Sequence, residues 1–210
     1  MDSKMNKQCA QCRRAGTKLF LKGEKCNGPK CALVKRNYPS GQHGLKRKRD
    51  KKSVYGKQLA EKQKAKEIYG LRERQFSRYM KEAVVKQGDT GEFLFSFLES
   101  RLDNVVFKMG LATSRPSARQ IVNHGHIAVN GRKVDIPSFR VKVGDVISLR
   151  DKSKSKSLFA KSVENLSKVE QISWLNVQPK EIQAKVLNRP MLDSPIFDVK
   201  SIIEFYSRKI

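Results

Sequence analysis

All four cysteines of this chain lie in one short segment, at Cys9, Cys12, Cys26 and Cys31. The segment holds few large apolar residues, chiefly the Leu-Phe-Leu run at 19–21. Fixing a backbone costs on the order of 1–2 kcal/mol per residue, which so little apolar burial cannot offset. The segment therefore needs a cross-link to hold one shape.

The spacing of the cysteines favours a metal site over disulfides. It reads C-x2-C, then 13 residues, then C-x4-C. Disulfides are disfavoured in a reducing compartment, whereas each close pair can supply two corners of a tetrahedral site. We predict one zinc ion with four cysteine ligands. An iron–sulfur cluster uses the same ligands, and it remains an alternative, as do four buried thiols or a redox pair. Residues 18–25 are expected to form a short hairpin arm.

The charge of the chain predicts a polyanionic partner. Lys and Arg outnumber Asp and Glu by 45 to 20, a formal net charge of +25. Such an excess repels itself unless a polyanion lies against it. Nucleic acid is the first candidate and an anionic membrane surface the second. No apolar run approaches the ~18 residues of a spanning helix, and the N-terminus lacks a signal-peptide pattern. We expect a cytoplasmic protein that does not enter a membrane.

A basic run follows the cysteine segment. Residues 46–52, KRKRDKK, contain six cations. A solvated charge run is one interpretation, and a phosphate-contacting arm is the other. We expect the arm, because side chains that stack on or bond to bases precede it. The residues expected to contact RNA here are Arg13, Arg14, Tyr38, Gln42, His43, Lys46, Arg47, Lys48 and Arg49.

Helical patterns occupy the next stretch. Ser53 is placed to cap a helix that ends near residue 69, before Gly70. A second helix is expected over 71–86 and a third from residue 90 to 109, both with apolar residues at helical spacing. The second is expected to bury Phe76, Tyr79, Met80, Ala83 and Val84. Its arginines fall mostly on other faces and are expected to meet a ligand: Arg72, Arg74 and Arg78.

Residues 113–149 predict a small α+β unit. Ser114 can cap a short helix with Pro116 in its first turn, and Gly125 can end it. Asn130-Gly131 is a strong signal for a hairpin turn, because a type I′ turn needs positive φ at both positions. Strands are expected at 126–129, 132–134 and 146–149. A further helix is expected over 181–187.

The pair His124 and His126 suggests a metal or catalytic site, but no cysteine or carboxylate lies close by in sequence; the nearest is Asp135. Residues two apart across a helix end and a strand start also point in different directions. A surface that binds RNA at bends and junctions accounts better for the residues. The residues expected to contact RNA in this unit are Ser114, Arg115, Ser117, Arg119, Gln120, Asn123, His124, His126, Asn130 and Arg132.

Residues 101–138, RLDNVVFKMGLATSRPSARQIVNHGHIAVNGRKVDIPS, resemble the RNA-binding domain of the bacterial small-subunit ribosomal protein four family. That domain also occurs in other proteins. YPSGQHG (38–44), EKQKAKEIYGLRERQF (61–76), LESRLDNVV (98–106) and EFYSR (204–208) are similar to the ribosomal protein in particular. The resemblance covers nearly the whole chain.

The resemblance implies an α+β fold: a mostly helical domain, made of the zinc-binding N-terminal segment and the C-terminal tail, with an inserted small α+β RNA-binding domain. That insert would have two short helices and a hairpin-rich antiparallel sheet. The boundaries expected are 1–45 for the zinc-binding segment, 46–98 for a basic helical domain, 99–162 for the RNA-binding domain, and 163–210 for a C-terminal segment that packs back on the others. We expect 99–162 to fold without the metal.

The resemblance also implies a function. The protein would be a structural, non-enzymatic constituent of the small ribosomal subunit. It would bind the ribosomal RNA directly, nucleate assembly of the 5′ domain and contribute to translational accuracy. It would contact small-subunit ribosomal protein five and lie near the place where messenger RNA enters. Members with cysteines at the positions of Cys9, Cys12, Cys26 and Cys31 are taken to bind zinc.

Two other function classes make different demands on the sequence. An RNA-modifying enzyme that carries the same domain needs a second domain with a catalytic Asp or a nucleotide site, and the remaining residues offer no such motif. A zinc-containing regulator of duplex DNA needs a recognition helix and a dimer seam, and neither is found in the sequence. Assays of aminoacylation or pseudouridine formation, and competition between RNA and DNA, would separate these classes.

Overall fold

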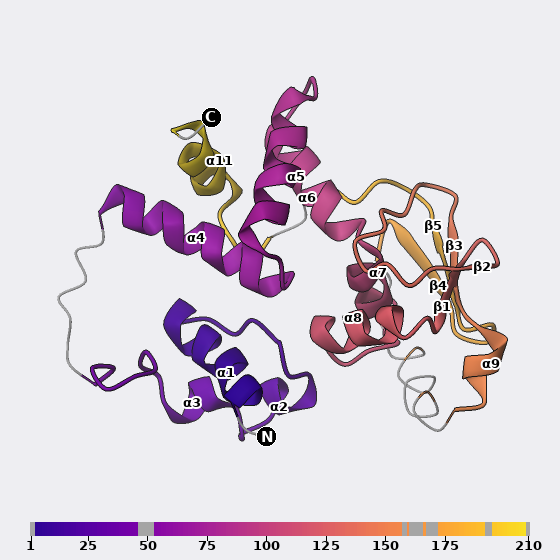
Figure 1. The fold of residues 1–210 in the computed structure, drawn as a ribbon, viewed down its shortest axis with the longest axis horizontal. Coiled ribbons are helices and arrows are strands. Elements are labelled where there is room, and N and C mark those ends of the chain that lie inside the picture. Colours follow the sequence, from indigo (N-terminus) through magenta and orange to yellow (C-terminus); the bar gives the residue numbers. More distant parts are fainter. Residues whose placement is uncertain are drawn as a thin grey trace. The chain divides into compact units, whose positions relative to one another are not determined.

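The chain divides into two compact units, the first formed by residues 1–91 and 194–210 and the second by residues 92–193. The structure is a computed structural model that describes residues 3–45, 53–156, 159, 166, 172–191 and 195–208. It combines helices with an antiparallel sheet, as the sequence predicts (Figure 1). Within the described ranges, none of the helices has both the length and the apolar character that crossing a membrane requires.

The N-terminal part of the first unit is helical around the cysteines. Helix α1 spans Ser3–Ala15, α2 spans Glu24–Asn27 and α3 spans Ala32–Lys35. Among the described residues the expected hairpin arm over 18–25 is absent, and turns lead into α2 instead. Leu19 and Leu21 are buried and make a small local core. The segment between the cysteine pairs therefore buries its own leucines and does not pair as a strand with any described residue.

Three helices form the larger part of the first unit: α4 (Val54–Ile68), α5 (Glu73–Val85) and α11 (Val199–Ser207). The Ser53 hydroxyl accepts a hydrogen bond from the Gly56 N–H at 3.1 Å, so the predicted cap is confirmed. Helix α11 packs along α4, which brings the C-terminal tail back to residues far away in sequence (Figure 1).

Helix α5 buries the predicted apolar face with one exception. Phe76, Tyr79, Met80 and Ala83 are buried as predicted, whereas Val84 is 46% exposed. Successive residues of a helix are rotated by roughly 100°, so Val84 follows the buried Ala83 onto another face. The prediction for Val84 was wrong because Val84 belongs to the apolar run in sequence but lies outside the face of the helix that is buried.

The second unit begins with two helices where the sequence suggested one. Helix α6 spans Thr90–Glu99 and α7 spans Leu102–Lys108. The chain is extended at Arg101 between them. The N–H groups of Leu102 and Asp103 donate to the carbonyls of Phe139 and Pro137, at 2.8 and 3.2 Å. The break therefore lets a distant segment pair with the first turn of α7.

Helix α8 (Arg115–Asn123) has the ends that the sequence predicts. The Ser114 hydroxyl accepts from the Ser117 N–H at 3.4 Å, and Gly125 follows the helix with φ +67°. The hairpin turn is confirmed as well, because Asn130 and Gly131 have φ of +50° and +77°. The signals for the cap and the turn lie in the residues that form them, so the sequence predicts both features.

An antiparallel sheet of five strands completes the second unit, in the order β2-β1-β3-β5-β4. The strands are β1 (Ile127–Val129), β2 (Arg132–Lys133), β3 (Val146–Leu149), β4 (Leu175–Gln178) and β5 (Gln183–Val186). β5 pairs with β3, with Ala184 opposite Ile147. Helices α7 and α8 lie against one face of the sheet (Figure 1). A short helix, α9 (Asp151–Lys154), follows β3.

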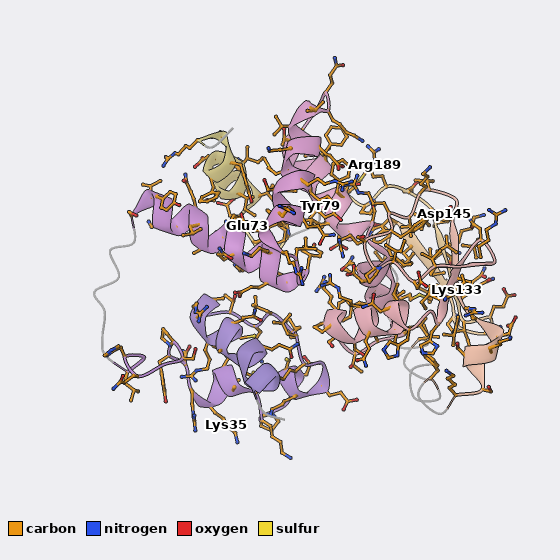
Figure 2. The ribbon with its side chains drawn as sticks, viewed as in Figure 1. Lys35, Glu73, Tyr79, Lys133, Asp145 and Arg189 are labelled. Atoms are coloured by element: carbon orange, nitrogen blue, oxygen red, sulfur yellow. The ribbon has the colours of Figure 1, made fainter. Side chains whose placement is uncertain are left out.

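Two expectations for the C-terminal region are corrected by this sheet. Residues 183–186 form a strand where the sequence suggested a helix. The β4–β5 hairpin belongs to the second unit, so 99–162 is not the whole of that unit. After β5 the chain returns to α6, where the guanidinium of Arg189 lies 5.5 Å from the ring of Phe93 (Arg189 is labelled in Figure 2).

Candidate nucleic-acid interface

The four cysteines surround one small cavity. Its volume is about 10 Å³, and Cys9, Cys12, Cys26 and Cys31 all line it. Helix α1 supplies the first pair, α2 supplies Cys26, and Cys31 precedes α3. The Lys22 N–H points at the Cys26 sulfur at 3.3 Å. The structure thus brings together the two pairs that the sequence separates.

The thiols influence one another. Burial raises the pKa of Cys12, and the charges of Cys26, Cys9 and Cys31 raise it further, against a hydrogen bond from the Leu19 backbone. Mutual repulsion of this kind is what a cation among four sulfurs would relieve. Within the part of the chain that the structure describes, no three His, Cys, Asp or Glu side chains form a group arranged to hold a metal ion. The donor set and the shared cavity fit a metal, while the coordination geometry itself is not formed.

A larger hollow of about 480 Å³ adjoins the cysteines. Cys9, Lys22, Lys25 and Ala32 line both cavities. None of the described residues that line the larger one is acidic. Its cationic residues are Arg13, Lys22, Lys25, Lys30, Lys35 and Arg36 (Lys35 is labelled in Figure 2). A concave surface with charges of one sign concentrates counter-ions, so this hollow suits phosphate groups.

Arg13 holds the loop that follows α3. Its guanidinium lies 4.6 Å from the centre of the Tyr38 ring. It also donates to the carbonyls of Arg36, Tyr38 and Pro39, at 3.2, 2.8 and 3.2 Å. Arg13 and Tyr38, both expected to contact RNA, are therefore engaged with each other. Their packing fixes the start of the loop that presents the next candidates.

The other candidates of the first unit are exposed where the structure describes them. Arg14, Gln42 and His43 are exposed, and so are Arg72, Arg74 and Arg78. Arg78 also pairs with Glu82 at 3.1 Å, one helical turn along α5. The basic residues Lys46, Arg47, Lys48 and Arg49 lie outside the described residues. The first unit therefore offers its hollow and these side chains to a ligand.

In the second unit, two expected RNA contacts of α8 make ion pairs within the protein. The Arg119 Nη2 lies 2.6 Å from a carboxylate oxygen of Asp103, which also binds the buried Arg101. Arg115 donates from Nε to the Asn104 side-chain oxygen at 2.8 Å and approaches Glu99 at 3.9 Å. Both arginines, which we expect to contact RNA, therefore also hold α8 to buried acids of the unit.

His126 also lies elsewhere than expected, with 9% of its surface exposed. Its Nδ1 is 3.0 Å from the Ser153 hydroxyl, and its ring meets the Phe159 ring edge-on. Burial lowers the pKa of His126, and the charges of Lys156, His124 and Arg150 lower it further. A ring packed inside the unit cannot stack on a base, so we remove His126 from the surface that RNA would contact.

The remaining candidates of this unit divide by role. Ser114 is buried and caps α8. The Asn130 side chain donates to Asp145 at 2.8 Å and accepts from the Val146 N–H at 2.9 Å, so it fixes the turn. Besides the part-exposed Arg115 and Arg119, the residues at or near the surface that remain for RNA are Ser117, Gln120, Asn123, His124 and Arg132.

Sequence reasoning missed two groups of residues. Lys30, Lys35 and Arg36 line the basic hollow, yet they are scattered between motifs. Glu99 and Asp103 hold the arginines of α8 from buried positions. The second group has a sequence signal: both acids interrupt the apolar stripe of 94–109, where a charged residue must be paired if the stripe is buried.

Comparison with known proteins assigns the family. Residues 4–99 match the ribosomal protein S4/S9 N-terminal domain, and residues 100–147 match the S4 domain. The chain is 51% identical over 203 residues to small ribosomal subunit protein uS4 of Acetivibrio thermocellus, with 95% of this chain and 96% of that protein covered. It is 52% and 48% identical over 202 residues to the uS4 proteins of Clostridioides difficile and Thermus thermophilus, with the same coverage. The chain therefore belongs to the uS4 family of bacterial small-ribosomal-subunit proteins.

Proposed function

We propose that this protein is a structural, non-enzymatic constituent of the small ribosomal subunit that binds ribosomal RNA directly in the cytoplasm. The observation that carries the proposal is the identity of about half of all residues with uS4 proteins over 95% of the chain. The net charge of +25 supports it, and so does the hollow, whose described lining holds six cations and no acid, because RNA phosphates are the ligand that such a surface favours.

The phosphate contacts are assigned to both units. In the first unit we propose the cations of the basic hollow, the run 46–49 and the exposed arginines of α5. In the second unit we propose the exposed end of α8 with His124, and the hairpin residue Arg132. Backbone contacts of this kind position a protein on RNA, and accessible bases at a junction add specificity.

Direct binding to ribosomal RNA is tested with the purified protein alone. Filter binding to transcripts of the 5′ domain of small-subunit ribosomal RNA, with transfer RNA and duplex DNA as competitors, gives the affinity and its specificity. We expect log K to fall linearly with log salt, and alanine at residues 46–49 to flatten that slope, by about 0.7–0.9 for each phosphate that is no longer neutralised. Equal affinity for all three nucleic acids would contradict the proposal.

We further propose that the protein nucleates assembly of the 5′ domain. From there it would contact small-subunit ribosomal protein five near the place where messenger RNA enters, and so contribute to translational accuracy. The family supports these roles. Reconstitution of the subunit with and without the protein tests assembly, because 5′-domain protection from nucleases should then depend on it. Cross-linking in the assembled subunit tests the neighbour.

For the cysteine cavity we propose one zinc ion held by Cys9, Cys12, Cys26 and Cys31. Four thiolate ligands leave no open position, so a bound zinc would be structural, fixing α1, α2 and α3 around it. The cavity shared by all four thiols supports this assignment. Native mass spectrometry with elemental analysis should show one zinc per chain. Visible absorption bands with iron content would point instead to an iron–sulfur cluster.

A further inference from the structure

Two buried carboxylates hold the arginines of α8. The side chains of Glu99 and Asp103 are 4% and 5% exposed, whereas those of Arg115 and Arg119 are 15% and 31% exposed. Arg119 donates from both Nε and Nη2 to one oxygen of Asp103, at 3.0 and 2.6 Å. The acids lie inside the unit, and the arginines extend from them toward its surface.

Arg115 is held from three sides. Its Nε donates to Asn104, whose amide in turn donates to the Glu99 carboxylate at 3.0 Å. Its Nη2 lies 3.9 Å from Glu99, and its guanidinium lies 4.7 Å from the centre of the Phe107 ring. A long side chain fixed by this many partners has lost most of its rotamer freedom before any ligand arrives.

Four basic side chains contact the two acids in the ion pairs that the described residues form. Two carboxylates, Glu99 and Asp103, face Arg101, Arg115, Arg119 and Lys108, whose Nζ is 4.0 Å from Glu99. Ion pairs that are buried seldom stabilise a fold more than apolar residues of the same volume would. Stability alone is therefore a weak reason to hold two part-exposed arginines on buried carboxylates, whereas a fixed pair of guanidinium groups suits phosphate.

We propose that Glu99 and Asp103 are positioning residues for RNA binding: they fix the guanidinium groups of Arg115 and Arg119, one helical turn apart, as a rigid pair for RNA phosphate. This inference rests on the proposed function. A guanidinium held in place loses less entropy on binding phosphate than a mobile one. The arginines thus stabilise the fold and also bind the RNA, whereas the acids affect RNA binding by positioning the arginines.

The direction in which RNA affinity changes when a negative charge is removed distinguishes positioning from simple electrostatic attraction. Glu99→Gln removes a negative charge beside the RNA surface, so electrostatics alone predicts tighter binding. Loss of positioning predicts weaker binding, because the hold on Arg115 is relaxed. Asp135→Asn makes the same charge change at a side chain that is 51% exposed and pairs only with the exposed Lys133 among the contacts that the structure shows. It is the matched control.

The experiment measures the dissociation constant of the whole protein for the 5′-domain transcript over a range of salt concentrations. Each value is taken well below the melting temperature and corrected for the folded fraction. We expect Glu99→Gln to bind about 3- to 10-fold more weakly than Asp135→Asn, roughly 0.7–1.4 kcal/mol at RT of 0.59 kcal/mol. Binding as tight as that of the control would overturn the proposal.

Arg119→Lys gives a second, independent readout that keeps the charge. Lysine can approach Asp103 with one nitrogen, whereas Arg119 uses two. We expect weaker binding and a flatter dependence on salt, by about 0.7–0.9 in slope if one phosphate is no longer bound. Wild-type affinity and slope would show that only the charge matters, and positioning would be refuted. Failure of the wild-type protein to prefer this transcript would refute the proposed function instead, so the two failures are distinguishable.

Discussion

Lys62 is a buried cation of α4 that contacts both α5 and α11. Only 4% of its surface is exposed, and its Nζ lies 2.8 Å from the Glu73 carboxylate and 4.6 Å from the centre of the Phe205 ring. The Tyr206 hydroxyl donates to the same carboxylate at 2.9 Å, and Lys66 binds its other oxygen. One carboxylate at the start of α5 thereby links α4 to α11 (Glu73 is labelled in Figure 2).

This cluster makes the first unit sensitive to acid. Burial by itself would raise the pKa of Glu73, but hydrogen bonds from Lys62, Lys66 and Tyr206 outweigh it and lower the pKa from 4.5 to about 2. A lowered pKa adds stability above pH 4.5 that is lost as the pH falls toward 2. Since 48% of the Glu73 side chain is exposed, solvent screens part of this effect.

We expect the free energy of unfolding of the first unit to fall between pH 4.5 and 2, and Glu73→Gln to remove most of that dependence. Tyr206→Phe, which deletes one donor, should remove a smaller part. Urea unfolding followed by circular dichroism measures this. Trp174, the single tryptophan, lies in the second unit, so its fluorescence is an internal control. An unchanged acid dependence in Glu73→Gln would contradict the assignment.

At the same scale, Arg119→Ala should destabilise the second unit. Asp103 loses one of its two arginine partners but keeps Arg101, so we expect a cost of about 1–3 kcal/mol, the range for a charged hydrogen bond in a buried setting. Arg132→Ala on the exposed strand β2 is the control, with a change within about 0.5 kcal/mol. Thermal unfolding followed by Trp174 fluorescence compares them. Equal melting temperatures would show that the contact between Arg119 and Asp103 does not stabilise the unit.

At the scale of elements, the β4–β5 hairpin completes the core of the second unit. Trp174, Leu175, Ala184 and Val186 are buried in the same cluster as the apolar residues of α7 and α8. β5 also covers the edge of β3, whose backbone groups would otherwise be unpaired. An uncovered edge invites pairing with other chains.

A fragment of residues 92–193 should therefore fold, whereas a fragment of residues 99–162 should not. The shorter fragment lacks β4, β5 and the residues that they bury, and it exposes β3. We expect a cooperative thermal transition and dispersed amide resonances only for the longer fragment, and aggregation of the shorter one. A cooperative thermal transition of monomeric 99–162 would show that the core of the unit folds without the hairpin.

At the scale of the whole molecule, the two units depend on different sources of stability. The second unit has an extensive buried apolar cluster. The segment around the cysteines has Leu19 and Leu21 as its main buried apolar residues besides the thiols. A structural zinc can supply an apparent ~10–16 kcal/mol at neutral pH, enough to replace a missing core.

Removal of the metal should therefore destabilise the segment around the cysteines and leave the second unit folded. We expect chelation, or Cys26→Ser together with Cys31→Ser, to abolish the hydrogen-exchange protection of residues 8–36 while residues 92–193 keep theirs. Hydrogen exchange read peptide by peptide measures both at once. Equal protection of residues 8–36 with and without metal would rule out a structural zinc, and loss of both regions would show that the units are coupled.

The sequence by itself determined the features whose signals are local or compositional. Caps at Ser53 and Ser114, the turn at Asn130-Gly131 and the buried face of α5 depend on neighbours a few residues away, so they could be predicted. The family followed from motifs that extend along the whole chain. The spacing of the cysteines likewise predicted that the two pairs would meet.

Only the tertiary structure decided which charged and ambiguous segments are buried. Residues 183–186 form a strand because β3 offers an edge about 35 residues away, which no local pattern records. The sequence places Arg119 and His126 together on one surface, but contacts with Asp103 and Ser153, 16 and 27 residues away in sequence, leave Arg119 part-exposed and bury His126. The partner of a charged or polar side chain is known only from the folded structure, because contacts between residues far apart in sequence decide whether that side chain is buried.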